Sequence, residues 1–211
     1  MTDPRPRGRF ITLEGIDGAG KSTHAAWLYD ALSDRGFAVV ATREPGGTPL
    51  GERLRKLLLD EPMSHDTEAL LVFAARREHV EQVIRPALSR GEWVLCDRFT
   101  DATYAYQGGG HGVDATRIRE LEQWVHADCK PDVTLLFDVP TQVSRERLAG
   151  NQREGRVLDK FERERDEFFQ RVRRVYLDRA QAEPARFRII ESARPLEEIR
   201  AQLQHILDTI A

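Results

Sequence analysis

Short apolar runs rich in β-branched residues alternate along the chain with longer segments whose apolar residues recur every three or four positions. Runs of the first kind predict strands, and segments of the second kind predict helices. The predicted strands lie near residues 9–14, 37–42, 93–97, 133–138 and 186–190. The predicted helices lie near residues 21–35, 50–59, 66–90, 114–127, 140–149, 157–182 and 195–210, with a short one near 100–106.

This alternation predicts an α/β fold in which a five-stranded parallel sheet is covered by helices on both faces, a three-layer αβα arrangement. Right-handed crossovers then place ligands at the carboxyl ends of the strands. A length of 211 residues favours a single domain, 1–211. Two polar, glycine-containing segments, 107–112 and 150–156, are expected to be mobile loops.

The segment between the first predicted strand and the first predicted helix fits G-x-x-x-x-G-K-[ST], the phosphate-binding loop of nucleotide-using proteins. The residues involved are Gly15, Ile16, Asp17, Gly18, Ala19, Gly20, Lys21, Ser22 and Thr23. Glycines let backbone N–H groups surround phosphate oxygens, and the following helix presents its positive end to them. Lys21 can supply a cation to the terminal phosphates, and the Ser22 hydroxyl can bind Mg²⁺. The alternative is a glycine-rich turn that binds nothing.

Two predicted strands end in a carboxylate, Asp97 and Asp138. A carboxylate at this position often holds Mg²⁺ in phosphate-loop enzymes. We favour Asp97 as the metal anchor because Arg98 follows it directly, which would place a phosphate-binding cation beside the metal. The alternative for each carboxylate is capping of the next helix.

Several arginines follow strand ends or lie near helix starts, where a second phosphate could be bound. Arg43, Arg55 and Arg98 could converge on such a phosphate, because a planar guanidinium binds phosphate oxygens in pairs. Each of them alone is more often a solvated surface charge. A second group, Arg145, Arg147, Arg153 and Arg156, surrounds segment 150–156 and predicts a lid over phosphates. The alternative for that group is a solvated basic helix end.

One helix carries a candidate site for a base. Val72, Phe73 and Arg76 lie within about one turn of each other, so an aromatic ring and a guanidinium could act together. Burial of Phe73 in the core is the alternative. Segment 101–110 adds hydroxyl and amide groups near the same end of the sheet.

Composition excludes several classes of protein. The chain is 40% hydrophobic and 32% charged with a net charge of −3, which is ordinary for a globular protein and does not favour nucleic acid as a partner. Apolar runs shorter than about eighteen residues predict no membrane span, and the polar start is not a secretory signal. Cys96 and Cys129 are isolated and lack metal-site spacing, which fits a reducing cytoplasm.

Taken in order, these motifs resemble those of the bacterial thymidylate kinases, a family of P-loop nucleoside monophosphate kinases. The resemblance extends from Phe10 to the last predicted helix. It rests on Glu14-Gly-x-Asp17-Gly-Ala-Gly-Lys-Ser-Thr23, Thr42-Arg-Glu-Pro-Gly-Gly47, Phe73-Ala-Ala-Arg76, Asp97-Arg98 and Tyr106-Gln-Gly-Gly-Gly110. It implies transfer of the γ-phosphoryl group from ATP to dTMP with Mg²⁺, a five-stranded parallel sheet and a homodimer.

The residues alone leave two alternatives open. One is another P-loop kinase acting on a nucleoside or on a different nucleoside monophosphate. The other is a switch that hydrolyses a nucleotide, although the Asn-Lys-x-Asp segment of guanine-specific switches is missing and Asn151 is the single asparagine in the chain.

The resemblance also implies a role for each matching residue. Lys21 and Ser22 would hold the ATP phosphates and Mg²⁺, and Asp17 would lie beside the deoxyribose 3′-hydroxyl. The residues implied to hold dTMP are Arg55 and Arg98 at its phosphate, with Glu44 nearby, and Arg76, Thr103 and Gln107 at its base. Many members place a stacking Phe where this chain has Val72, and Phe73 would have to cover the base instead. Because the phosphate loop carries no arginine, Arg153 or Arg156 would supply the catalytic cation from the lid, alongside Lys21 and Arg98.

Overall fold

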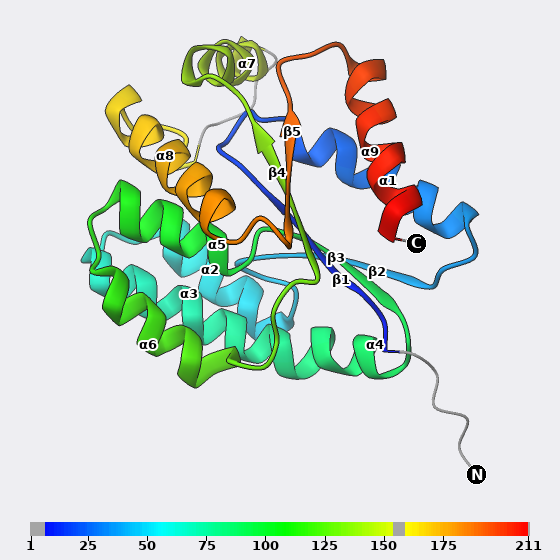
Figure 1. The fold of residues 1–211 in the computed structure, drawn as a ribbon. Helices are drawn as coiled ribbons and strands as arrows, with labels where there is room; N and C mark the ends of the chain where they lie inside the picture. Colours follow the sequence, from blue (N-terminus) through cyan, green and yellow to red (C-terminus); the bar gives the residue numbers. More distant parts are fainter. Residues whose placement is uncertain (1–6, 154–158, 211) are drawn as a thin grey trace.

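The structure, a computed structural model, describes residues 7–153 and 159–210, with the side chains of 151–153 excepted. Among these residues five parallel strands form one sheet in the order β2-β3-β1-β4-β5 (Figure 1). The strands are β1 (Phe10–Glu14), β2 (Val39–Arg43), β3 (Trp93–Asp97), β4 (Val133–Asp138) and β5 (Phe187–Glu191). Each lies within two residues of its predicted position, so the predicted fold class is confirmed.

Helices cover both faces of this sheet (Figure 1). They are α1 (Lys21–Asp34), α2 (Pro49–Asp60), α3 (His65–His79), α4 (Arg85–Ser89), α5 (Thr100–Thr103), α6 (Ala115–His126), α7 (Thr141–Arg153), α8 (Asp166–Ala182) and α9 (Leu196–Ile210). Two π-helical segments, η1 (Val80–Ile84) and η2 (Tyr104–Gly110), join α3 to α4 and extend α5. Helices α1 and α9 lie on one side of the sheet, and α3, α6 and α8 lie on the other (Figure 1).

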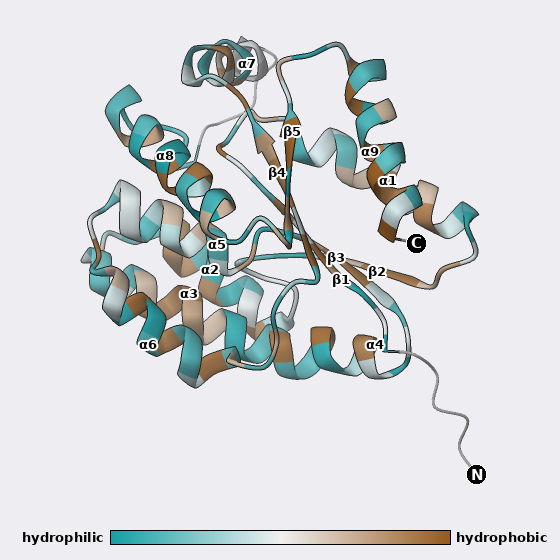
Figure 2. Cartoon of the chain, in the orientation of Figure 1, coloured by the Kyte–Doolittle hydropathy of each residue, from teal (hydrophilic) through white to brown (hydrophobic). Residues whose placement is uncertain are grey.

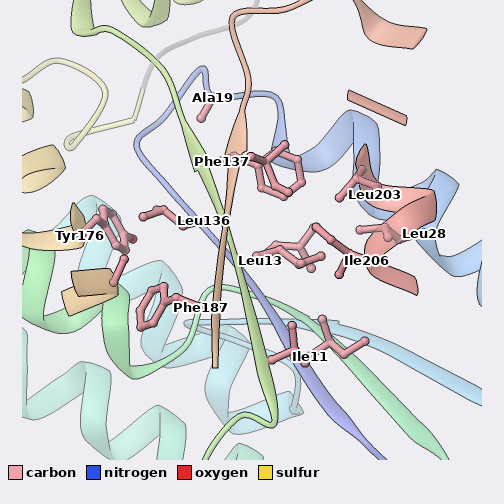
Figure 3. Close-up of a cluster of buried hydrophobic side chains, with 14 of the residues drawn as sticks. Ile11, Leu13, Ala19, Leu28, Leu136, Phe137, Tyr176, Phe187, Leu203 and Ile206 are labelled. Carbon is pink, nitrogen blue, oxygen red and sulfur yellow. The ribbon is translucent and has the colours of Figure 1, made fainter. Parts of the chain in front are cut away.

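Side chains that alternate along the strands build a core on each face of the sheet. In Figure 3 Phe137 points toward Leu203 of α9, whereas its neighbour Leu136 points toward Tyr176 of α8. Successive residues of a strand point to opposite faces, so β4 packs on both layers of helices. Figure 2 shows the same division, with hydrophobic residues along the strands and hydrophilic ones on the outer sides of the helices.

The helix predicted for 157–182 is too long at its start, because α8 begins at Asp166. The Asp159 carboxylate accepts hydrogen bonds from the backbone N–H groups of Phe161 and Glu162, at 2.9 and 3.0 Å. A side chain that binds the backbone ahead of it favours a turn over a helix. The charged residues that follow continue the helical spacing and conceal this turn in the sequence.

The loop predicted for 107–112 is also wrong in part, since η2 extends through Gly110. A Cβ at Gly110 would lie 2.3 Å from the Phe168 ring, and one at Gly109 would lie 2.5 Å from Val175. These glycines therefore let η2 pack closely against α8, and they do not make the segment a loop. Of segment 150–156, the first four residues belong to α7, and the rest lie outside the described residues.

Candidate active site

The phosphate-binding loop joins the end of β1 to the start of α1. Gly15 and Gly20 have φ angles of 136° and 89°, which are accessible to glycine and costly for other residues. A Cβ at Gly15 would also lie 2.4 Å from the carbonyl oxygen of Phe137, so the loop needs glycine there for space as well. The turn brings the N-terminus of α1, at Lys21, to the carboxyl end of the sheet, where an anion is favoured.

Three side chains from distant segments hold the backbone of this loop. The Ser144 hydroxyl donates to the carbonyl of Asp17 at 2.6 Å, and Arg147 donates to the carbonyl of Gly18 at 3.2 Å. The Ser192 hydroxyl donates to the carbonyl of Ala19. These contacts tie the loop to α7 and to the turn after β5, so its shape is fixed by the protein itself. Sequence reasoning missed Ser144 and Ser192, because isolated serines carry no signal of such a role.

Lys21 is buried, and its ammonium donates to the carbonyls of Gly15 and Ile16 at 2.9 and 3.1 Å. Burial and the nearby Arg98 guanidinium lower the pKa of Lys21, and the carboxylate of Asp97 partly opposes this effect. Lys21 and Arg98 are two cations held close together, so a bound polyanion would relieve the repulsion between them.

A cleft runs from the phosphate loop past the ends of β2 and β3. The described residues that line it include Gly18, Gly20, Lys21, Ser22, Thr23, Arg43, Asp97 and Arg147. A second cavity opens beside it, and five residues line both: Asp17, Glu44, Arg55, Arg98 and Asp159. The structure therefore places two adjoining hollows at the carboxyl end of the sheet with arginines between them. We call the first the phosphate cleft and the second the acceptor cavity.

The donors at the phosphate cleft fit a magnesium ion. Ser22 and Asp97 both line the cleft, and one carboxylate oxygen of Asp97 is buried without a hydrogen-bond partner among the described residues. Asp138 is instead bound by Arg173 through two hydrogen bonds of 2.7 and 2.8 Å. No cluster of three metal-binding side chains occurs in the described part of the chain, but Mg²⁺ in such sites takes most of its ligands from water and phosphate.

Arg98 forms the boundary between the two hollows. Its guanidinium donates to Asp17 at 2.6 Å, to the hydroxyls of Tyr106 and Tyr176 at 3.0 and 3.2 Å, and to the carbonyl of Gly15 at 3.1 Å. Its φ of 71° is a left-handed conformation that is strained for a residue other than glycine. Strain of this kind persists only where the surroundings impose it, and it is concentrated at functional sites.

The other two arginines of the predicted phosphate site differ in position. Arg55 lines both hollows, and it donates to the carbonyl of Pro45 at 3.1 Å. Arg43 lines the phosphate cleft but not the acceptor cavity, as far as the described residues show, and it pairs with Glu52 at 2.8 Å near the surface. Arg55 and Arg98 are therefore the pair that converges.

Arg76 and Glu44 form a buried pair at the acceptor cavity, where Glu44 also borders the phosphate cleft. The guanidinium donates to Glu44 at 2.7 Å and to the Thr103 hydroxyl at 3.0 Å, and its remaining nitrogen has no partner among the described residues. His79 donates to the other oxygen of Glu44 at 2.9 Å. Burial would raise the pKa of Glu44, but Arg76 and His79 outweigh it and hold the pKa below its usual range. Glu44 thus fixes Arg76 in place.

Phe73 lies behind Arg76, away from the cavity wall. It is 1% exposed, and the Arg76 guanidinium lies 4.8 Å from its ring centre. Of the described residues, Val72 and Phe99 line the cavity and Phe73 does not. The family pattern has its stacking Phe one residue earlier, at the position of Val72. Adjacent helix residues point about 100° apart, so a ring at position 73 does not face the cavity wall. The expectation that Phe73 covers a bound base therefore has no support in this geometry.

Several residues of the acceptor cavity were absent from the sequence-based site. Thr103 and Gln107 line it as expected, and Phe99, Tyr106, Asp159 and Phe161 join them. Tyr106 donates to Asp17 at 2.7 Å. Phe99 and Tyr106 are neighbours of predicted site residues, which is a usable signal, whereas Asp159 and Phe161 were concealed in the overlong helix. The side chain of Arg153 and all of Arg156 lie outside the described residues.

A glycine-rich loop at the N-terminus of α1, with two arginines across a shared cleft, defines a phosphotransferase of the P-loop class. The thymidylate kinase family model matches residues 13–203. A thymidylate kinase of Bordetella pertussis is 65% identical over 94% of this chain and 93% of its own length. One from Methylobacillus flagellatus is 58% identical over 95% and 97%. A crystal structure of thymidylate kinase from Ehrlichia chaffeensis superposes with a TM-score of 0.77 and 35% identity, covering 96% of this chain and 99% of that one. The chain belongs to the thymidylate kinase family.

Proposed function

We propose that this protein transfers the γ-phosphoryl group of ATP to dTMP and releases dTDP and ADP. The observation that carries the proposal is the position of Lys21, Arg55 and Arg98 around one cleft, with the acceptor cavity beyond the two arginines. Phosphoryl transfer depends mainly on alignment of two phosphates and neutralisation of their charge, and this arrangement supplies both. Membership of the family and the names of its close relatives support the same reaction.

On the donor side, residues 15–23 hold the ATP phosphates through the loop backbone and Lys21. Ser22 and Asp97 hold Mg²⁺, which neutralises charge on the donor phosphates when bound. We propose one domain, 1–211, in which segment 150–156 acts as a lid and brings Arg153 or Arg156 to the transferred group.

On the acceptor side, Arg55 and Arg98 hold the dTMP phosphate between the two hollows. Asp17 accepts a hydrogen bond from the deoxyribose 3′-hydroxyl in addition to those from Arg98 and Tyr106. Burial alone would raise the pKa of Asp17, but Arg98 and Lys21 keep it below its usual range, so this carboxylate is an acceptor at neutral pH. Arg76, Thr103 and Gln107 bind the base edge, with Glu44 holding Arg76.

The same geometry argues against a nucleoside as the acceptor, because a nucleoside hydroxyl needs a base to activate it. Asp17 is engaged by Arg98 and Tyr106 and is a weak base with its lowered pKa. Glu14 is fully buried and accepts hydrogen bonds from the backbone of Phe99 and the hydroxyl of Tyr176. An acceptor that already bears an ionised phosphate needs no such base.

A coupled assay of ADP release with dTMP, thymidine, dUMP, dCMP and GMP tests the proposal. We expect dTMP to give the highest kcat/KM and thymidine to give none. Turnover with thymidine but not dTMP would identify a nucleoside kinase. Slow hydrolysis that no acceptor changes would identify a nucleotide switch.

We also propose that the protein forms a homodimer through the outer faces of α3 and α6. Leu70 and Trp124 are 55% and 80% exposed there, and Ala69 and Leu121 line the groove between them. Exposed apolar patches of this kind mark interaction surfaces, and tryptophan often dominates their energetics.

Replacing Trp124 with glutamate should therefore raise the dimer dissociation constant by at least about 30-fold, as expected for an interface hot spot. Sedimentation velocity over a concentration series measures the change. Tyr29→Glu on α1, where the ring is 40% exposed, is the matched control and should leave the dimer intact. A Trp124 variant that sediments like the unmodified protein would contradict this interface.

A further inference from the structure

Glu68 of α3 is a buried carboxylate directly behind the base end of the acceptor cavity. It is 2% exposed. Its Oε1 accepts hydrogen bonds from Gln107 Nε2 and His111 Nδ1, both at 2.9 Å, and its Oε2 lies 2.6 Å from the ammonium of Lys160. Among the described residues, those lining the cavity include Gln107 but not Glu68. Glu68 therefore acts on a bound nucleotide only through its partners.

The three partners keep Glu68 ionised. Burial alone would raise the pKa of Glu68, but hydrogen bonds from His111, Gln107 and Lys160 lower it to about 2. An ionised carboxylate has acceptors and no donor. The end of the Gln107 side chain that meets Glu68 must therefore be the amide NH₂, which leaves the carbonyl Oε1 of Gln107 as its other polar atom.

Gln107 lies on the cavity wall next to a fixed donor. It is one helical turn beyond Thr103, whose hydroxyl accepts from Arg76 at 3.0 Å. The wall thus carries a guanidinium, which can only donate, and an amide that turns its NH₂ group toward Glu68 and keeps its carbonyl as an acceptor. A base edge that fits this wall has a carbonyl oxygen beside a ring N–H.

We propose that Glu68 is a positioning residue that fixes Gln107 as a hydrogen-bond acceptor and so selects thymine-type bases over cytosine. Thymine and uracil present the O4 carbonyl beside the N3–H group, which matches Arg76 and Gln107. Cytosine presents an amino group beside an unprotonated ring nitrogen, the reverse pattern, and leaves both protein groups unpaired. The proposal rests on the proposed function, because the acceptor cavity must hold the pyrimidine.

The variant Glu68→Gln tests this inference. A neutral amide of the same shape can donate or accept, so Gln107 is no longer held in one orientation. We expect the ratio of the dCMP to dTMP dissociation constants, measured by titration calorimetry, to fall about tenfold, the size of one hydrogen bond to a buried group. An unchanged ratio in a variant with native circular dichroism overturns the proposal.

Lys160→Gln is the matched control, because it removes the contact to Oε2 and leaves the one to Gln107. It should keep the ratio of dissociation constants. An equal fall in both variants would mean that Glu68 acts by holding segment 159–164, and it would overturn the assignment to Gln107.

If Glu68→Gln does not fold, Gln107→Met removes the acceptor directly and should lower the same ratio, and an unchanged ratio again overturns the proposal. Turnover of dTMP by the unmodified enzyme tests the proposed function separately from this ratio.

Discussion

Replacing Arg98 with methionine is expected to lower kcat/KM for dTMP by about 10²- to 10³-fold at saturating ATP, the usual effect of removing one hydrogen-bond donor that stabilises transition-state charge. Methionine keeps much of the side-chain volume but removes the planar fork, which binds two phosphate oxygens at once. Arg98 also borders both hollows, so its loss affects alignment of the two substrates together with charge. Steady-state kinetics with dTMP as the varied substrate measure the change.

Two controls separate this effect from a loss of structure. Removing the guanidinium leaves Asp17 without its main charge partner, and the melting temperature should fall because a partly buried charge is no longer paired. Arg98→Lys keeps a positive charge there and should recover most of the stability but little of the activity. Arg174→Met, at a side chain that is 77% exposed, should change neither quantity. An Arg98→Met enzyme within about threefold of the parent kcat/KM would contradict the role in binding the acceptor phosphate.

The parts of this protein that sequence predicts well are those set by local pattern. Strands β1, β3 and β4 are short apolar runs between turn residues, and their spacing leaves little choice of fold. The phosphate loop is predicted equally well, because only glycine fits the backbone at positions such as Gly15. In each case the physical requirement acts on neighbouring residues and is visible in their order.

The parts that sequence misses depend on packing between distant segments. Gly109 and Gly110 resemble a loop, but they permit close contact between η2 and α8, which are more than fifty residues apart. Phe73 has the right chemistry for a base site, but helix rotation places it behind Arg76. Neither outcome can be read from the residues alone, because each depends on which side of a helix meets which neighbour.

The proposed mechanism needs one more cation besides Lys21, placed over the transferred phosphoryl group on the donor side of the phosphate cleft. The loop positions between Gly15 and Gly20 carry no basic residue. Arg55 and Arg98 border the acceptor cavity, and Arg98 is already bound to Asp17. The sequence of segment 150–156 offers Arg153 and Arg156 for this role, and α7, which ends at Arg153, carries Arg147 on the wall of the same cleft.

The double variant Arg153→Ala with Arg156→Ala is therefore expected to lower kcat by about 10³- to 10⁵-fold, the range measured for arginines that stabilise phosphoryl-transfer charge. The affinity for dTMP should change little, because the acceptor contacts proposed for Arg55 and Arg98 do not involve the lid. Single-turnover kinetics measure the chemical step, and calorimetry measures dTMP binding. Arg145→Ala is the matched control, since Arg145 lies on α7, as Arg153 does, but pairs with Asp166 at 3.4 Å. Unchanged turnover in both single variants and in the double variant would refute the lid assignment and leave the catalytic cation to be sought among Lys21, Arg98 and Arg147.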